Sequence, residues 1–136
     1  MKAFVYGSLK KNFGNHVLLQ TSNYLGEGTT LNPQYSMVNL GSFPGVYQNG
    51  NGYIRGEVYE INQSTLARLD LLEGEGNFYS RRKTDVKIDN EIHECYMYVL
   101  LRNYSYMNEN RKEIPHKNEC VYSWKKDYQI LIENSL

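Results

Sequence analysis

Short apolar segments with an alternating pattern run through most of the chain and predict a sheet. Phe, Val, Tyr and Ile dominate these segments, and Gly, Asn or Pro bounds them, which is typical of strands that bury one face. The sequence Asn49-Gly50-Asn51-Gly52 predicts a hairpin turn because both residue types accept a positive φ, and Asp89-Asn90 predicts a second turn. We expect strands over residues 3–6, 22–26, 35–40, 53–60, 83–88 and 93–101.

One segment between these strands has the period of a helix. Leu66, Leu69 and Leu72 are three residues apart and share one helical face. Asn62 and the residues after it provide the start of this helix, and Gly74 is placed to end it.

Two shorter segments predict further helices. Residues 15–20 follow a glycine-containing loop, and residues 122–132 predict a terminal helix with Trp124 available for docking. Helices packed on a mostly antiparallel, curved sheet indicate the α+β class.

Length and charge narrow the class of protein. The chain has 136 residues, which fits one domain over residues 1–136. Acidic and basic residues are equal in number, 15 of each, so we expect neither nucleic acid nor an anionic membrane as a partner. The basic pairs Lys10-Lys11 and Lys125-Lys126 are expected on the solvated surface. No charged leader with an apolar stretch is present, and no run could cross a bilayer, so we expect a cytoplasmic protein.

The cysteines and histidines do not form a recognisable metal motif. Cys95 and Cys120 are expected to be reduced thiols in a chain without a secretory leader. His16, His93 and His116 are scattered, without the spacing of a zinc site. We therefore expect no metal.

Two motifs provide candidate chemistry. The first strand leads into Tyr6-Gly7-Ser8-Leu9, where the glycine lets backbone N–H groups approach an anion. No glycine follows Ser8 in the pattern of a nucleophile elbow, so Ser8 is not expected to be a nucleophile.

The second motif places carboxylates at a helix end. Glu73 would lie in the C-terminal turn, where the helix dipole and burial under Phe78 and Tyr79 both raise the pKa of its carboxyl group. Asp70 and Glu75 are close in sequence and remain alternatives. Asp70 could instead hold the turn through backbone N–H groups.

These motifs and several others occur in the order and spacing of one family. They are Phe43-Pro44-Gly45-Val46, Gly56-Glu57-Val58-Tyr59-Glu60-Ile61, Leu69-Asp70-x-x-Glu73, Tyr79-x-Arg81, Cys95-Tyr96-Met97-Tyr98-Val99, and Trp124 with Tyr128. With Tyr6-Gly7-Ser8-Leu9, the set resembles the gamma-glutamyl cyclotransferase-like family. The resemblance implies a small mixed, mostly antiparallel β-barrel flanked by helices, without a cofactor.

The resemblance also implies an activity and a site. Glu73 would be the catalytic acid and base in the cyclisation of a small-molecule γ-glutamyl substrate to 5-oxoproline, and the γ-glutamylamine type is the more similar group. The implied substrate-binding residues are Tyr6, Gly7, Ser8, Leu9, Tyr79, Arg81 and Tyr98. A non-catalytic binding module on the same fold is the alternative, and Tyr104 with Tyr106 is the local hint of a protein-binding face.

Overall fold

The computed structural model describes residues 1–101 and 119–134. Tyr104 and Tyr106, and with them the suggested protein-binding face, lie outside the described residues. The elements in chain order are β1 (Lys2–Val5), the 3₁₀-helix η1 (His16–Leu19), β2 (Asn23–Thr30), β3 (Tyr35–Asn39), β4 (Pro44–Glu60), α1 (Gln63–Glu73), β5 (Tyr79–Ile88), β6 (Glu91–Leu100), β7 (Cys120–Lys125) and β8 (Gln129–Asn134).

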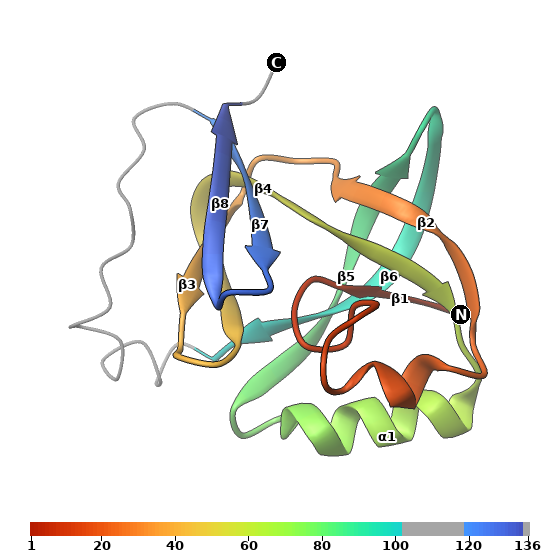
Figure 1. The fold of residues 1–136 in the computed structure, drawn as a ribbon. Helices are drawn as coiled ribbons and strands as arrows, with labels where there is room; N and C mark the ends of the chain where they lie inside the picture. Colours follow the sequence, from red (N-terminus) through yellow and green to blue (C-terminus); the bar gives the residue numbers. More distant parts are fainter. Residues whose placement is uncertain (102–118, 135–136) are drawn as a thin grey trace.

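Five of the strands close into a barrel (Figure 1). They follow the order β1-β6-β5-β2-β4, and β1 also pairs with β4, which joins the two edges. Only β1 and β6 are parallel within this ring. Phe4, Val58, Val86 and Met97 fill the barrel as almost fully buried side chains. The expected α+β fold with a mixed, mostly antiparallel barrel is confirmed.

The strand β4 is 17 residues long and belongs to two sheets. Its C-terminal half pairs with β1 and β2 in the barrel. Its N-terminal half pairs with β3, and its middle residues, from Gly52 to Ile54, run parallel to β7, which in turn pairs with β8. The β7–β8 hairpin therefore stands beside the barrel on an extension of one barrel strand (Figure 1).

The helix α1 begins and ends where the sequence predicts. The side chain of Asn62 accepts a hydrogen bond from the Thr65 backbone N–H at 2.8 Å, and Gly74 ends the helix in the left-handed conformation at φ 59°. Leu66 and Leu69 are buried in the core beside the barrel, whereas Leu72 is 42% exposed. One face of α1 thus covers the barrel while its last turn reaches the surface.

The predicted terminal helix over residues 122–132 is wrong. Residues 120–125 and 129–134 form β7 and β8, joined by a tight turn. β7 is buried continuously from Tyr122 to Trp124, whereas in β8 the half-buried Ile130 and Ile132 alternate with exposed residues, so burial there repeats every second residue. This two-residue period is that of a strand rather than a helix.

The predicted hairpin turn at residues 49–52 is also wrong. These residues lie inside β4, where pairing with β3 jumps from Tyr47 opposite Ser36 to Gly52 opposite Tyr35. The Asn-Gly repeat therefore forms a wide bulge, and the Gly50 N–H donates to the Gln34 carbonyl oxygen at 3.0 Å. None of residues 49–52 has a positive φ, so the backbone conformation on which the turn prediction rested does not occur here.

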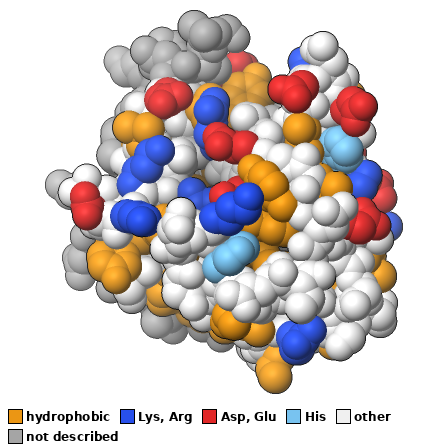
Figure 2. Space-filling model, turned by 45° about the vertical axis from the view of Figure 1, so that its right-hand side comes forward, with side chains coloured by type: hydrophobic (Ala, Val, Ile, Leu, Met, Phe, Trp, Pro, Cys, Tyr) orange, Lys and Arg blue, Asp and Glu red, His pale blue; other side chains and the backbone are white. Residues whose placement is uncertain are grey.

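Several other expectations can be checked on the described chain. Cys95 and Cys120 are buried free thiols. No helix of the described ranges is long and apolar enough to span a membrane. On the face drawn in Figure 2, acidic and basic side chains lie side by side around a small hydrophobic patch.

Candidate functional site

A cleft of about 720 Å³ opens beside the barrel. Its walls are the loop after β1, the segment before β4, the last turn of α1 and the turn between β7 and β8. Most residues expected at the site line this cleft, namely Tyr6, Gly7, Ser8, Leu9, Glu73, Tyr79 and Tyr98. Arg81 does not line it.

The loop after β1 is held in a fixed turn at the base of the cleft. The Gly7 carbonyl oxygen accepts a hydrogen bond from the Lys10 N–H at 3.0 Å, and the Ser8 carbonyl oxygen accepts one from the Asn15 N–H at 3.0 Å. The Asn15 side-chain amide also donates to Ser8 Oγ at 2.9 Å. A Cβ atom on Gly7 would lie 2.8 Å from the ring of Pro44, so only glycine permits this close packing.

The tyrosine hydroxyl groups around the cleft are bound to the protein itself. Tyr6 donates to the Tyr98 carbonyl oxygen at 2.7 Å, and Tyr79 donates to the Pro44 carbonyl oxygen at 2.9 Å. Tyr98 donates to Asp70 Oδ1 at 2.5 Å. These side chains thus offer a substrate their rings, while their hydroxyl groups join the walls of the cleft to one another.

Glu73 presents a carboxyl group to the cleft from the last position of α1. Burial removes water from this half-buried group and raises its pKa to about 7, the direction that the sequence predicts. Its negative charge adds to burial in raising the pKa of Tyr6, Tyr79 and Tyr98, so it lies close to all three. Neither a hydrogen bond nor an ion pair joins Glu73 to another described residue.

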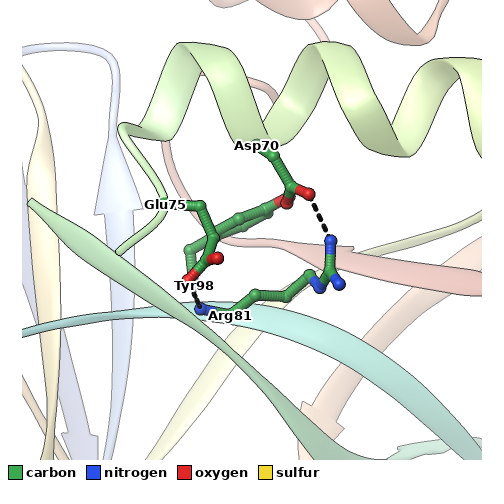
Figure 3. Close-up of polar contacts among 4 residues, drawn as sticks. All are labelled: Asp70, Glu75, Arg81 and Tyr98. Atoms are coloured by element: carbon green, nitrogen blue, oxygen red, sulfur yellow. Dashed lines mark hydrogen bonds and ion pairs between the residues drawn. The ribbon is translucent and has the colours of Figure 1, made fainter. Parts of the chain in front are cut away.

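The neighbouring carboxylates have other environments (Figure 3). Asp70 forms an ion pair with Arg81 and accepts the Tyr98 hydroxyl, so it does not bind backbone N–H groups through its side chain as the sequence suggested. Its carbonyl oxygen accepts the Gly74 and Glu75 N–H groups instead. Glu75 is exposed and accepts the Arg81 backbone N–H at 3.3 Å. Neither carboxylate lines the cleft.

Arg81 connects α1 to the barrel. Its guanidinium group pairs with Asp70 and stacks over the Tyr96 ring at 4.9 Å. Both Arg81 and Tyr98 lie opposite each other on the paired strands β5 and β6. The Asp70 carboxylate therefore ties the last turn of the helix to two barrel strands.

Sequence reasoning missed residues on the outer wall of the cleft. Lys10 was expected in solvent, yet its Nζ donates to the Trp124 carbonyl oxygen at 2.8 Å, and burial lowers its pKa. Lys126 and Tyr128 line the cleft from the β7–β8 turn, which the expected terminal helix concealed. The two-residue spacing of Tyr122 and Trp124 was the available signal for this hairpin.

Comparison with known proteins connects this arrangement to one family. The family model described as "Gamma-glutamyl cyclotransferase, AIG2-like" matches residues 3–126. The chain belongs to this family. The gamma-glutamylcyclotransferase family protein YtfP of Escherichia coli is 38% identical over 102 residues, which cover 75% of this chain and 84% of that protein. The protein of the same name from Citrobacter rodentium is 39% identical, covering 75% of this chain and 83% of its own length.

Solved structures of gamma-glutamyl cyclotransferase-like proteins share the fold. A mouse AIG2-like protein aligns with a TM-score of 0.67 at 25% identity, over 86% of this chain and 97% of that one. The solution structure of E. coli YtfP aligns with a TM-score of 0.57 at 35% identity, over 77% and 87%. The family match includes the barrel, α1 and β7 and ends at Lys126, so β8 lies beyond the matched residues.

Proposed function

We propose that the protein is a γ-glutamyl cyclotransferase, which cyclises a γ-glutamyl group to 5-oxoproline and releases an amine or amino acid. The observation that carries this proposal is the position of Glu73. Its carboxyl group, with a pKa of about 7, faces the same cleft as the Tyr6–Leu9 turn in a chain that belongs to this family. A group with this pKa is present in both protonation states near neutral pH.

The reaction needs proton transfer but no nucleophile from the enzyme. The α-amine of the substrate attacks its own γ-carbonyl carbon, a C–N bond closes the five-membered ring, and the original amide C–N bond breaks. The α-ammonium nitrogen loses two protons on the way to the lactam N–H, one before the attack and one as the ring C–N bond forms. The Glu73 carboxylate carries them in turn to the departing nitrogen, which leaves as an ammonium ion. Atoms and charges balance without water or a cofactor. Holding the amine against the carbonyl provides the effective molarity of an intramolecular reaction.

The other residues predicted at the site would bind the substrate, exclude water or position Glu73. The backbone N–H groups of the Tyr6–Leu9 turn would bind the glutamyl carboxylate or the developing oxyanion. Tyr79 and Tyr98 would form the walls that exclude water around Glu73. Arg81 would act as a positioning residue through Asp70, because it does not reach the cleft.

The test compares two glutamates at the same helix end. We expect Glu73→Gln to lower 5-oxoproline release from a panel of γ-glutamyl amino acids and γ-glutamylamines at least about 100-fold, because it removes the proton carrier. Glu75→Gln is the matched control, since Glu75 is exposed and lies outside the cleft, and it should retain the rate. For the unsubstituted protein, kcat/KM should rise with pH around pH 7, as the Glu73 carboxyl deprotonates.

The outcomes separate an enzyme from a binding module. Equal loss of rate in both variants would contradict the assignment of Glu73. Substrate binding by the unsubstituted protein, measured by calorimetry, without any 5-oxoproline from the panel would favour the binding module instead.

A further inference from the structure

Few charged side chains line the cleft, and they come from different elements. Among the described residues of its walls, only Glu73 and Lys126 carry a formal charge. Glu73 projects from the last turn of α1, whereas Lys126 projects from the β7–β8 turn. Lys126 is exposed and has no ion-pair partner within residues 1–101 and 119–134. The cleft thus offers one free ammonium group to a bound molecule.

The turn that carries Lys126 is held in place from two sides. Asn39 Nδ2 donates to the Tyr128 carbonyl oxygen at 2.7 Å, which ties the turn to the end of β3. Lys10 Nζ donates to the Trp124 carbonyl oxygen at 2.8 Å, which ties β7 to the loop after β1. Figure 1 shows the β7–β8 turn next to that loop. These contacts hold the backbone on both sides of Lys126 in place relative to the loop after β1.

Aromatic side chains form the rim next to this lysine. Phe43 is 37% exposed and Tyr128 is 55% exposed, and both line the cleft. Phe43 packs edge-on against Phe78, with ring centroids 6.3 Å apart. Leu72, from the last turn of α1, adds an exposed aliphatic side chain to the same walls. A ligand at this rim would meet apolar surface and one cation.

From these contacts we infer that Lys126 is a specificity-determining residue, which binds an anionic group on the leaving amine and selects γ-glutamyl derivatives of apolar α-amino acids. The inference rests on the proposed function: if Glu73 and the Tyr6–Leu9 turn hold the γ-glutamyl group, the leaving amine extends to the aromatic rim. Its carboxylate then meets the ammonium group of Lys126, and its side chain packs on Phe43 and Tyr128. A leaving amine with a second ammonium group would be repelled.

The experiment uses two substrates that differ only in the carboxylate that Lys126 is proposed to bind. γ-Glutamylphenylalanine and γ-glutamylphenethylamine share the aromatic leaving group, and only the first has a carboxylate on it. We expect the unsubstituted protein to prefer γ-glutamylphenylalanine about fivefold in kcat/KM, the size of one exposed charge pair. Lys126→Gln should bring this ratio to about one, and Lys126→Glu should invert it, by the same principle. Lys125→Gln is the matched control, because Lys125 is exposed on β7 and does not line the cleft.

Each outcome decides between alternatives. A ratio that is the same in the unsubstituted protein and Lys126→Gln overturns the inference. A loss of rate that is equal for both substrates also overturns it, because Lys126 would then bind the glutamyl part. If neither substrate reacts, the proposed function fails, and calorimetric affinities of the two compounds for the unsubstituted protein and Lys126→Gln test the contact separately. Equal affinities in that assay would overturn it.

Discussion

Glu73 owes its properties to the absence of a compensating charge among the described residues. Asp70, one helical turn earlier, has the Arg81 guanidinium group as its partner, and Glu75 lies in solvent. Glu73 has neither, so burial alone sets the direction of its pKa. The Glu73 carboxyl group can therefore exchange a proton near neutral pH.

This difference predicts how stability depends on pH. The pKa of Glu73 is about 7 in the folded protein and 4.5 when the group is fully solvated, as in the unfolded chain. Between these pH values the folded state therefore keeps a proton that the unfolded state loses. Glu73 therefore makes its full contribution to the free energy of unfolding below pH 4.5, and this contribution is lost as the pH rises to about 7. We expect Glu73→Gln to be more stable than the unsubstituted protein at pH 8 by on the order of 2 kcal/mol, and to lose that advantage at pH 4.

Chemical unfolding at the two pH values measures this effect. Glu75→Gln provides the comparison, because it makes the same chemical change at an exposed position next to the same helix end. An equal advantage of Glu73→Gln at both pH values would show that packing, and not the proton, is responsible.

At the scale of the element, the last turn of α1 carries two carboxyl groups with different surroundings: Asp70 is anchored to the barrel, and Glu73 lines the cleft. Asp70 and Glu73 are three residues apart, so their side chains project from neighbouring positions on the helix. Asp70 is bound to Arg81 of β5 and to Tyr98 of β6. Since Tyr98 also accepts the Tyr6 hydroxyl through its carbonyl oxygen, the anchor reaches the loop on the opposite wall.

Asp70→Asn tests whether these contacts of Asp70 hold the last turn of α1 in place. We expect it to lower the free energy of unfolding by about 1–2 kcal/mol, because it removes the charge that pairs with a half-buried guanidinium group. The same change should lower kcat more than it raises KM, since Glu73 loses its fixed position while the Tyr6–Leu9 turn stays intact. Asp85→Asn, at an exposed position of β5, should change neither quantity. A rise in KM alone would indicate that Asp70 acts on substrate binding.

The ends of α1 could be predicted because local chemistry decides them. Asn62 caps the first turn with its own side chain, and Gly74 adopts the left-handed conformation that glycine favours. The cleft-lining positions of Glu73 and the Tyr6–Leu9 turn were also expected, from an ordered set of motifs.

Other features depend on contacts between distant segments and could not be predicted from the local sequence. Asn49–Gly52 forms a bulge because β3 pairs on both sides of it. Lys10 is half-buried because Trp124, 114 residues later, offers a carbonyl oxygen. The helix predicted over residues 122–132 was wrong because pairing of β7 with β4 and with β8 selects strands there.

At the scale of the whole molecule, β4 joins the closed barrel to the hairpin that forms the outer wall of the cleft. Only three residues of β4, Gly52 to Ile54, pair with β7, from Cys120 to Tyr122. The contact is close: a Cβ atom on Gly52 would lie 2.3 Å from the Tyr122 ring. The attachment of the hairpin therefore depends on a three-residue pairing in which Gly52 leaves room for the Tyr122 ring.

Gly52→Ala tests this attachment. We expect it to lower the free energy of unfolding by about 1–3 kcal/mol, because the added methyl group overpacks a buried contact. Amide hydrogen exchange should show faster exchange in β7 and β8 than in the unsubstituted protein, while β1 and β6 keep their protection. Gly14→Ala is the control, because a Cβ atom there meets nothing within 4 Å. Uniformly faster exchange through all strands would show that hairpin and barrel unfold as one unit.

Because β4 belongs to both the barrel and the outer sheet, it also affects which parts of the sequence can change. The barrel strands hold α1 and the loop after β1, whereas the β7–β8 hairpin is attached by one short parallel pairing with β4 and by the side chains of Tyr122 and Trp124, which are buried in the same core as Phe4. The inward side chains of the hairpin are therefore constrained by the barrel core, whereas the turn between β7 and β8 is exposed. In evolutionary terms, selection can change this turn, which forms the outer wall of the cleft, without rebuilding the closed ring of strands.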